Sequence, residues 1–76
     1  MNKSWSENLK NLTRERAGFG MMVKSLDGNS GMIVSSGEKI VINSVEMKNY
    51  FPSPTNETIA EFDNVEKMIE AGWAID

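Results

Sequence analysis

Apolar residues recur at helical spacing close to the end of the chain, and this is the clearest pattern in the sequence. Five of them fall on one side of a helical wheel: Phe62, Val65, Met68, Ile69 and Trp73. Charged and polar residues fill the other side, which is typical of a helix with one buried face. We therefore expect an amphipathic helix over 63–71, too short to be stable without a surface to pack on.

Both ends of this helix carry recognisable signals. Asp63 is the expected N-cap, because its carboxylate can accept hydrogen bonds from the free N–H groups of the first turn. Glu66 stands three residues later and completes a capping box. Gly72 lies where helices commonly end in a left-handed residue.

The central part of the chain, residues 20–47, has the composition of β-strands. Three segments rich in apolar and β-branched residues are separated by turn-forming sequences: 20–26, 31–35 and 39–44. The turns lie at 27–31 and 36–37, since glycine tolerates the backbone angles that tight turns require. An antiparallel meander follows, with the helix over 63–71 packed on one of its faces.

The segments between the meander and the helix have weaker patterns. Apolar and charged residues alternate in 45–51, which fits a strand and, nearly as well, a single helical turn. Residues 52–56 are expected to form a loop, because Pro52 and Pro54 lack an N–H donor and have a fixed φ. Residues 58–62 fit a short edge strand that leads into the helix.

A first helix is predicted over 4–17, where Ser4 and Glu7 form a second capping box. Its apolar stripe is narrow and consists of Trp5, Leu9 and Leu12. Basic residues gather in its later turns, where they complement the helix dipole: Lys10, Arg14 and Arg16.

These patterns together predict one α+β domain over residues 1–76. It consists of a small antiparallel sheet of three to four strands, a C-terminal amphipathic helix packed on the sheet, and an N-terminal helix. A chain of 76 residues buries only about 60–65% of its unfolded surface and is marginally stable. Small domains without disulfides often gain stability by association, so a homo-oligomer is an open alternative to a monomer.

The chain contains no cysteine and no histidine. Both absences remove the usual zinc ligands, the commonest general base and the commonest thiol nucleophile. We therefore expect no catalytic residue, no metal and no cofactor. No apolar run is long enough for a membrane span or a signal peptide, which predicts a cytoplasmic protein without a membrane partner.

The sequence favours a non-enzymatic protein-binding module that acts as an inhibitor or an adaptor. Tyr50 and Phe51 lie beside a proline-stiffened loop, and large aromatic side chains at such a place are good interface anchors. Asp63, Glu66 and Glu70 would form an acidic helix face that complements a basic site on a partner. Small cysteine-free chains often come from bacteria or their phages, so one form of this hypothesis is a phage or mobile-element protein that acts on a host protein.

Two alternatives use the basic residues of the first helix. In one, an oligomer binds a small molecule or nucleotide whose phosphates contact Lys10, Arg14 and Arg16. In the other, the same helix binds nucleic acid weakly, with Trp5 as a stacking platform. Nucleic acid is the less favoured partner, because the net charge is −3 and residues 49–76 carry six acidic side chains against one lysine.

Overall fold

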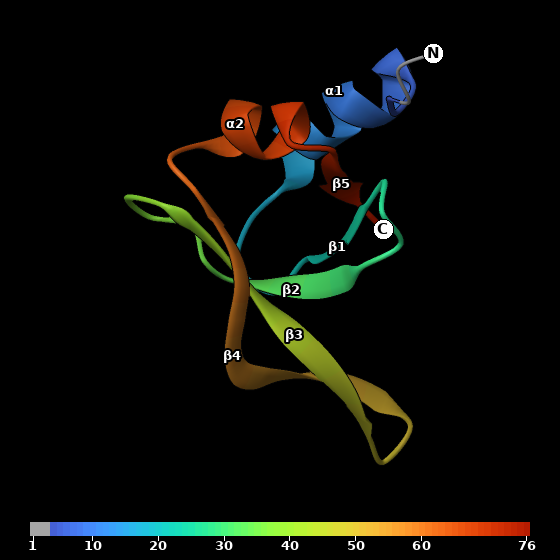
Figure 1. The fold of residues 1–76 in the computed structure, drawn as a ribbon, viewed down its shortest axis with the longest axis vertical. Helices are drawn as coiled ribbons and strands as arrows, with labels where there is room; N and C mark the ends of the chain where they lie inside the picture. The colour runs from blue at the N-terminus through green and yellow to red at the C-terminus, as the bar shows by residue number, and fades with distance from the viewer. Residues whose placement is uncertain (1–3) are drawn as a thin grey trace.

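A computed structural model describes residues 4–76 of the protein (Figure 1). Over this range the chain forms, in order, α1 (Glu7–Arg16), β1 (Met22–Ser25), β2 (Ser30–Ser35), β3 (Ile40–Lys48), β4 (Phe51–Phe62), α2 (Val65–Glu70) and β5 (Trp73–Ile75). The strands make one five-stranded sheet in the order β4-β3-β2-β1-β5. Every pair of neighbouring strands is antiparallel.

The α+β class and a helix near each end are confirmed, but the predicted sheet and the predicted C-terminal amphipathic helix are wrong. The sheet has five strands instead of three to four, and the C-terminal helix spans only Val65–Glu70 instead of 63–71. Phe62 and Trp73, which complete the helical pattern in the sequence, belong to β4 and β5. Helix and flanking strands turn their apolar residues toward one core, so the sequence pattern resembles a single longer helix.

The ends of α2 differ in part from the prediction. The N-cap is Asn64, whose side-chain oxygen accepts a hydrogen bond from the Lys67 N–H at 2.9 Å, so Asp63 lies one residue outside the cap. Gly72 follows the helix in the left-handed region, with φ +97°. It turns the chain so that Trp73 enters the sheet next to β1.

Strands β3 and β4 form a long hairpin that includes the predicted loop over 52–56. A two-residue turn at Asn49 and Tyr50 joins them, and both turn residues have positive φ, 50° and 70°. This combination is the signature of a type I′ turn, whose twist matches that of the strands it connects. The edge strand expected at 58–62 is therefore only the last part of β4.

The hydrophobic core lies between the sheet and α2. Its buried members come from four strands and one helix: Val23, Ile33, Ile40, Ile42, Met68 and Trp73. Helix α2 contacts both β4 and β5, at one end of the longest axis of the molecule (Figure 1). No described helix is long and apolar enough to span a membrane.

Helix α1 begins later than predicted, with Ser6 as N-cap instead of Ser4. It packs against β5 and α2. Thr13 is fully buried there, and its hydroxyl accepts a hydrogen bond from the Ile75 N–H at 3.1 Å and donates to the Leu9 carbonyl at 2.8 Å. Trp5 precedes the helix and donates from Nε1 to the Gly72 carbonyl at 2.8 Å.

Candidate functional site

The end of the β3–β4 hairpin, residues 45–54, projects away from the helices, and we call it the hairpin arm (Figure 1). None of the buried core residues belongs to it. Three large apolar side chains at its end are strongly exposed: Tyr50 by 94%, Phe51 by 72% and Met47 by 69%. Such a concentration of exposed apolar side chains on a small fold makes the end of the arm a candidate contact surface.

The strand register divides the arm into two faces. Directly opposite residues of an antiparallel pair share a face, and neighbours along a strand alternate between faces. The pairs Val45–Pro54 and Met47–Pro52 therefore form one face, which is entirely apolar. The pairs Glu46–Ser53 and Lys48–Phe51 form the other face, which is polar except for the Phe51 ring. Tyr50 lies in the turn between them.

The two prolines fit into β4 because of their position in the ladder. In a two-residue hairpin the pair that flanks the turn, here Lys48 and Phe51, is hydrogen-bonded, and bonded and non-bonded pairs then alternate. Pro52 and Pro54 fall in the non-bonded pairs, so their nitrogens point away from β3 along the free edge of the sheet. Proline is tolerated at such edge positions because no ladder hydrogen bond is lost.

The acidic residues predicted to bind the same partner lie at the opposite end of the molecule. Asp63 is in the bend between β4 and α2, while Glu66 and Glu70 belong to α2. Glu66 is engaged by Arg14, with a Nε–Oε2 distance of 2.7 Å, and Glu70 by Lys67 at 3.6 Å. The structure thus separates Tyr50 and Phe51 from the acidic residues along the longest axis, which measures 37 Å.

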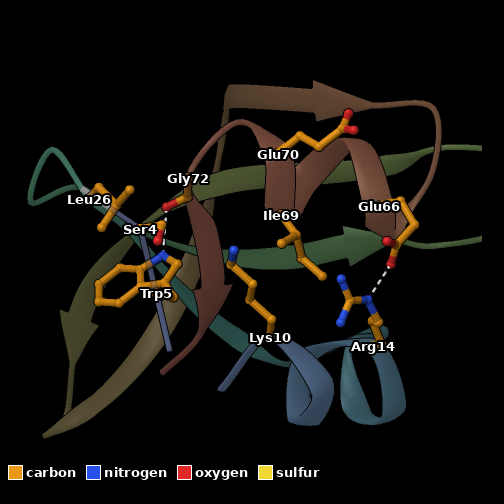
Figure 2. Close-up of a pocket in the computed structure, with 9 residues that line it drawn as sticks. All are labelled: Ser4, Trp5, Lys10, Arg14, Leu26, Glu66, Ile69, Glu70 and Gly72. Atoms are coloured by element: carbon orange, nitrogen blue, oxygen red, sulfur yellow. Dashed lines mark hydrogen bonds and ion pairs between the residues drawn. The ribbon is translucent and has the colours of Figure 1, made fainter. Parts of the chain in front are cut away.

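A second candidate site is a cleft of about 240 Å³ between α1 and α2. Figure 2 shows its lining residues, among which Lys10 and Arg14 rise from α1 toward the side chains of α2. The cleft brings two of the predicted phosphate-binding residues next to Glu66 and Glu70, whereas Arg16 does not line it. Carboxylates at the mouth of a site disfavour an anionic ligand by charge repulsion.

Arg14 is the most constrained cation of this cleft. Besides its bond to Glu66, its Nη1 donates to the Asn11 side chain at 2.7 Å. The hydrogen bond with Glu66 raises the pKa of the guanidinium above its ordinary value. Because the pKa of Arg14 is raised, its ion pair with Glu66 contributes to folding stability below the ordinary pKa of arginine. This contribution is lost only at strongly alkaline pH. The charge is therefore present throughout the neutral range.

The sequence predicts Tyr50 and Phe51 as anchors, and the strand register places Met47, Pro52 and Pro54 beside them on the arm. The sequence contains a signal for a strand here, because Val45 and Met47 alternate with charged residues. Pro52 and Pro54 nevertheless predict a loop over 52–56, so the sequence does not indicate that they pair with Met47 and Val45.

Residues 4–76 contain no grouping of three or more acidic side chains that could hold a metal ion. Comparison of the chain with protein-family models, with curated proteins and with solved structures gave no significant match.

Proposed function

We propose that this protein is a non-enzymatic protein-binding module, an inhibitor or an adaptor, that contacts its partner through the end of the hairpin arm. The observation that carries the proposal is the exposure of Tyr50, Phe51 and Met47 on a projection that contributes nothing to the buried core. Aromatic side chains of this kind provide much of the binding energy in protein interfaces.

The turn itself supports a role in binding. Glycine is the preferred second residue of a type I′ turn, because a positive φ is unfavourable for a side chain with a Cβ. This chain places a tyrosine there, with φ 70° and almost complete exposure. A large side chain that is unfavourable for the turn and unused by the fold is best explained by a contact outside the molecule.

The proposal leaves the acidic residues of α2 out of the contact. Glu66 and Glu70 each already have a cation within 4 Å, and they lie at the far end of the molecule from the arm (Figure 1). A single partner of ordinary interface size, about 800 Å² per side, would not need to reach both ends.

The proposal is tested with a variant that removes the three exposed side chains of the arm, Met47→Ser, Tyr50→Asn and Phe51→Thr. Asparagine is chosen because it tolerates a positive φ, and threonine because it suits a strand. The variant should remain folded, with a melting temperature within several degrees of the wild type, and lose the proteins that the wild type retains from extracts of its natural source.

A matched control is Phe19→Thr, which removes an aromatic side chain that is 78% exposed but lies outside the arm. It should retain the same proteins as the wild type. The proposal is wrong if the arm variant retains them too, or if the Phe19 control loses them to the same extent.

A further inference from the structure

We infer that the hairpin arm inserts into a groove on its partner protein, which then contacts both faces and the turn of the arm through side chains. One wall of this groove is apolar, and the other combines an apolar pocket for the Phe51 ring with polar groups for Glu46 and Lys48. This inference rests on the proposed function and adds the shape and chemistry of the partner. It excludes two simpler modes of contact, which are a flat surface against one face of the arm and a strand added to its free edge.

The distribution of apolar groups over the arm indicates a concave partner. Val45, Met47, Pro52 and Pro54 occupy one face, as the strand register requires. Phe51 occupies the opposite face and is 72% exposed. A flat partner that covered the first face would leave the Phe51 ring in water, whereas a groove covers both faces. Its second wall has to offer polar partners to Glu46 and Lys48, which share the face of Phe51.

The same distribution of apolar groups disfavours a second copy of this chain as the partner. Two arms packed face to face would bury one face of each and leave the Phe51 ring or the Met47 side chain of each exposed. Fully burying Tyr50 and Phe51 would remove about 150–250 Å² each from water. Tyr50 and Phe51 by themselves therefore supply less than about 800 Å² per partner, the size of an ordinary interface, so the contact has to extend to further residues of the arm.

The free edge of the arm is unsuited to strand addition. The nitrogens of Pro52 and Pro54 point outward along this edge and carry no hydrogen. A strand added there could donate to the outward carbonyl groups of the arm, but it would receive no hydrogen bond from these two positions, as a regular ladder requires. Partners that bind by strand addition obtain their affinity from main-chain hydrogen bonds. The arm must instead be recognised through its side chains.

The experiment places a photo-crosslinking phenylalanine analogue at one position at a time in the full chain, inside cells of its natural source. Position 47 probes the first face, 51 the opposite face and 50 the turn, while 19 is the exposed control outside the arm. We expect positions 47, 50 and 51 to capture one and the same protein, with position 19 capturing none of it. Mapped crosslinks from 47 and 51 should fall on opposite walls of one groove.

The outcomes separate the inference from the proposed function. Capture from position 47 alone or from position 51 alone would keep the arm as the contact and overturn the groove. Capture of a second copy of this chain would overturn the inference in favour of self-association. Absence of any capture from the three arm positions would overturn both the inference and the proposed function.

Affinity measurements on the captured partner complete the test. Met47→Ser and Phe51→Ser alter opposite faces, and each should weaken binding by at least about tenfold, while Phe19→Ser should change it less than about twofold. Pro54→Ala restores an N–H on the free edge, and we expect affinity to fall or stay the same. A tighter complex with Pro54→Ala, or an effect confined to one face, would contradict the inference.

Discussion

Gly31 occupies the tightest position in the sheet. A Cβ built on it would lie 2.5 Å from Cγ2 of Ile42, 2.8 Å from the Asn43 carbonyl oxygen and 3.1 Å from Cδ1 of Ile59. One of these atoms belongs to the backbone of β3 and cannot move without disturbing the ladder. The close approach of β2, β3 and β4 therefore depends on the absence of a side chain at this position.

Gly31→Ala should lower the free energy of unfolding by about 1–3 kcal/mol, since overpacking forces neighbouring groups out of place. Gly37→Ala is the matched control, because nothing lies within 4 Å of the added carbon there. Urea unfolding of both variants measures the difference. Equal midpoints for the two would show that the sheet relaxes freely around residue 31.

Tyr50 is the residue whose local conformation conflicts most with its side chain. Its φ of 70° is unfavourable for tyrosine, so Tyr50→Gly should raise the free energy of unfolding by about 0.5–1 kcal/mol while abolishing partner binding. Phe51→Gly, in the adjoining strand, should instead lower stability, because glycine is unfavourable in extended strands. Chemical denaturation of both variants measures these changes in the free energy of unfolding, and a loss of stability in Tyr50→Gly would show that the turn is not strained by tyrosine.

At the scale of elements, α1 covers the edge of the sheet that β5 would otherwise expose. Strand β5 has only three residues, all buried, and pairs with β1 on its inner side. On its outer side the Ile75 N–H donates to the Thr13 hydroxyl of α1. An uncovered edge invites pairing with other chains, so this hydrogen bond both satisfies the strand and anchors the helix.

Thr13→Val should destabilise the protein by about 1–3 kcal/mol, because it leaves the Ile75 N–H without a partner in a buried position. The more specific measurement is amide exchange at Ile75, which should become faster in Thr13→Val and stay slow in Thr13→Ser, where the hydroxyl remains. Unchanged exchange in the valine variant would mean that the helix covers the edge by packing alone.

At the scale of the whole molecule, the chain consists of a packed end and a projecting end. The packed end holds both helices and the buried residues, while the arm is a two-stranded ribbon without a core of its own (Figure 1). Two-stranded hairpins alone are marginally stable in water. The arm should therefore open locally without unfolding the rest.

Hydrogen exchange followed by NMR should show this division directly. Amides of Glu46 and Ser53 in the arm should exchange roughly a hundredfold or more faster than those of Ile33 and Ile42 in the core. The control is Ala74, which belongs to the short edge strand β5 but is fully buried and should be protected like the core. Uniform protection from core to arm would show that the molecule opens only as one unit.

Much of the local structure followed from the sequence alone. The α+β class, a helix near each end, the central strands and the left-handed helix stop at Gly72 were all readable, because they rest largely on interactions between residues close in sequence. Turns and helix stops depend on one or two residues and on the φ range of glycine, whereas the N-caps lie one and two residues from the predicted Asp63 and Ser4. Tyr50 and Phe51 were candidate anchors because they are aromatic residues beside two prolines.

Tertiary structure decided what local signals could not. The continuation of β4 through Pro52 and Pro54, and the existence of β5, depend on pairing with strands elsewhere in the chain. The contact between Arg14 and Glu66, 52 residues apart, assigns both to one cleft. Because long-range pairing and burial contribute more free energy than local propensity, they alone determined which apolar residues entered the core and which remained on the hairpin arm.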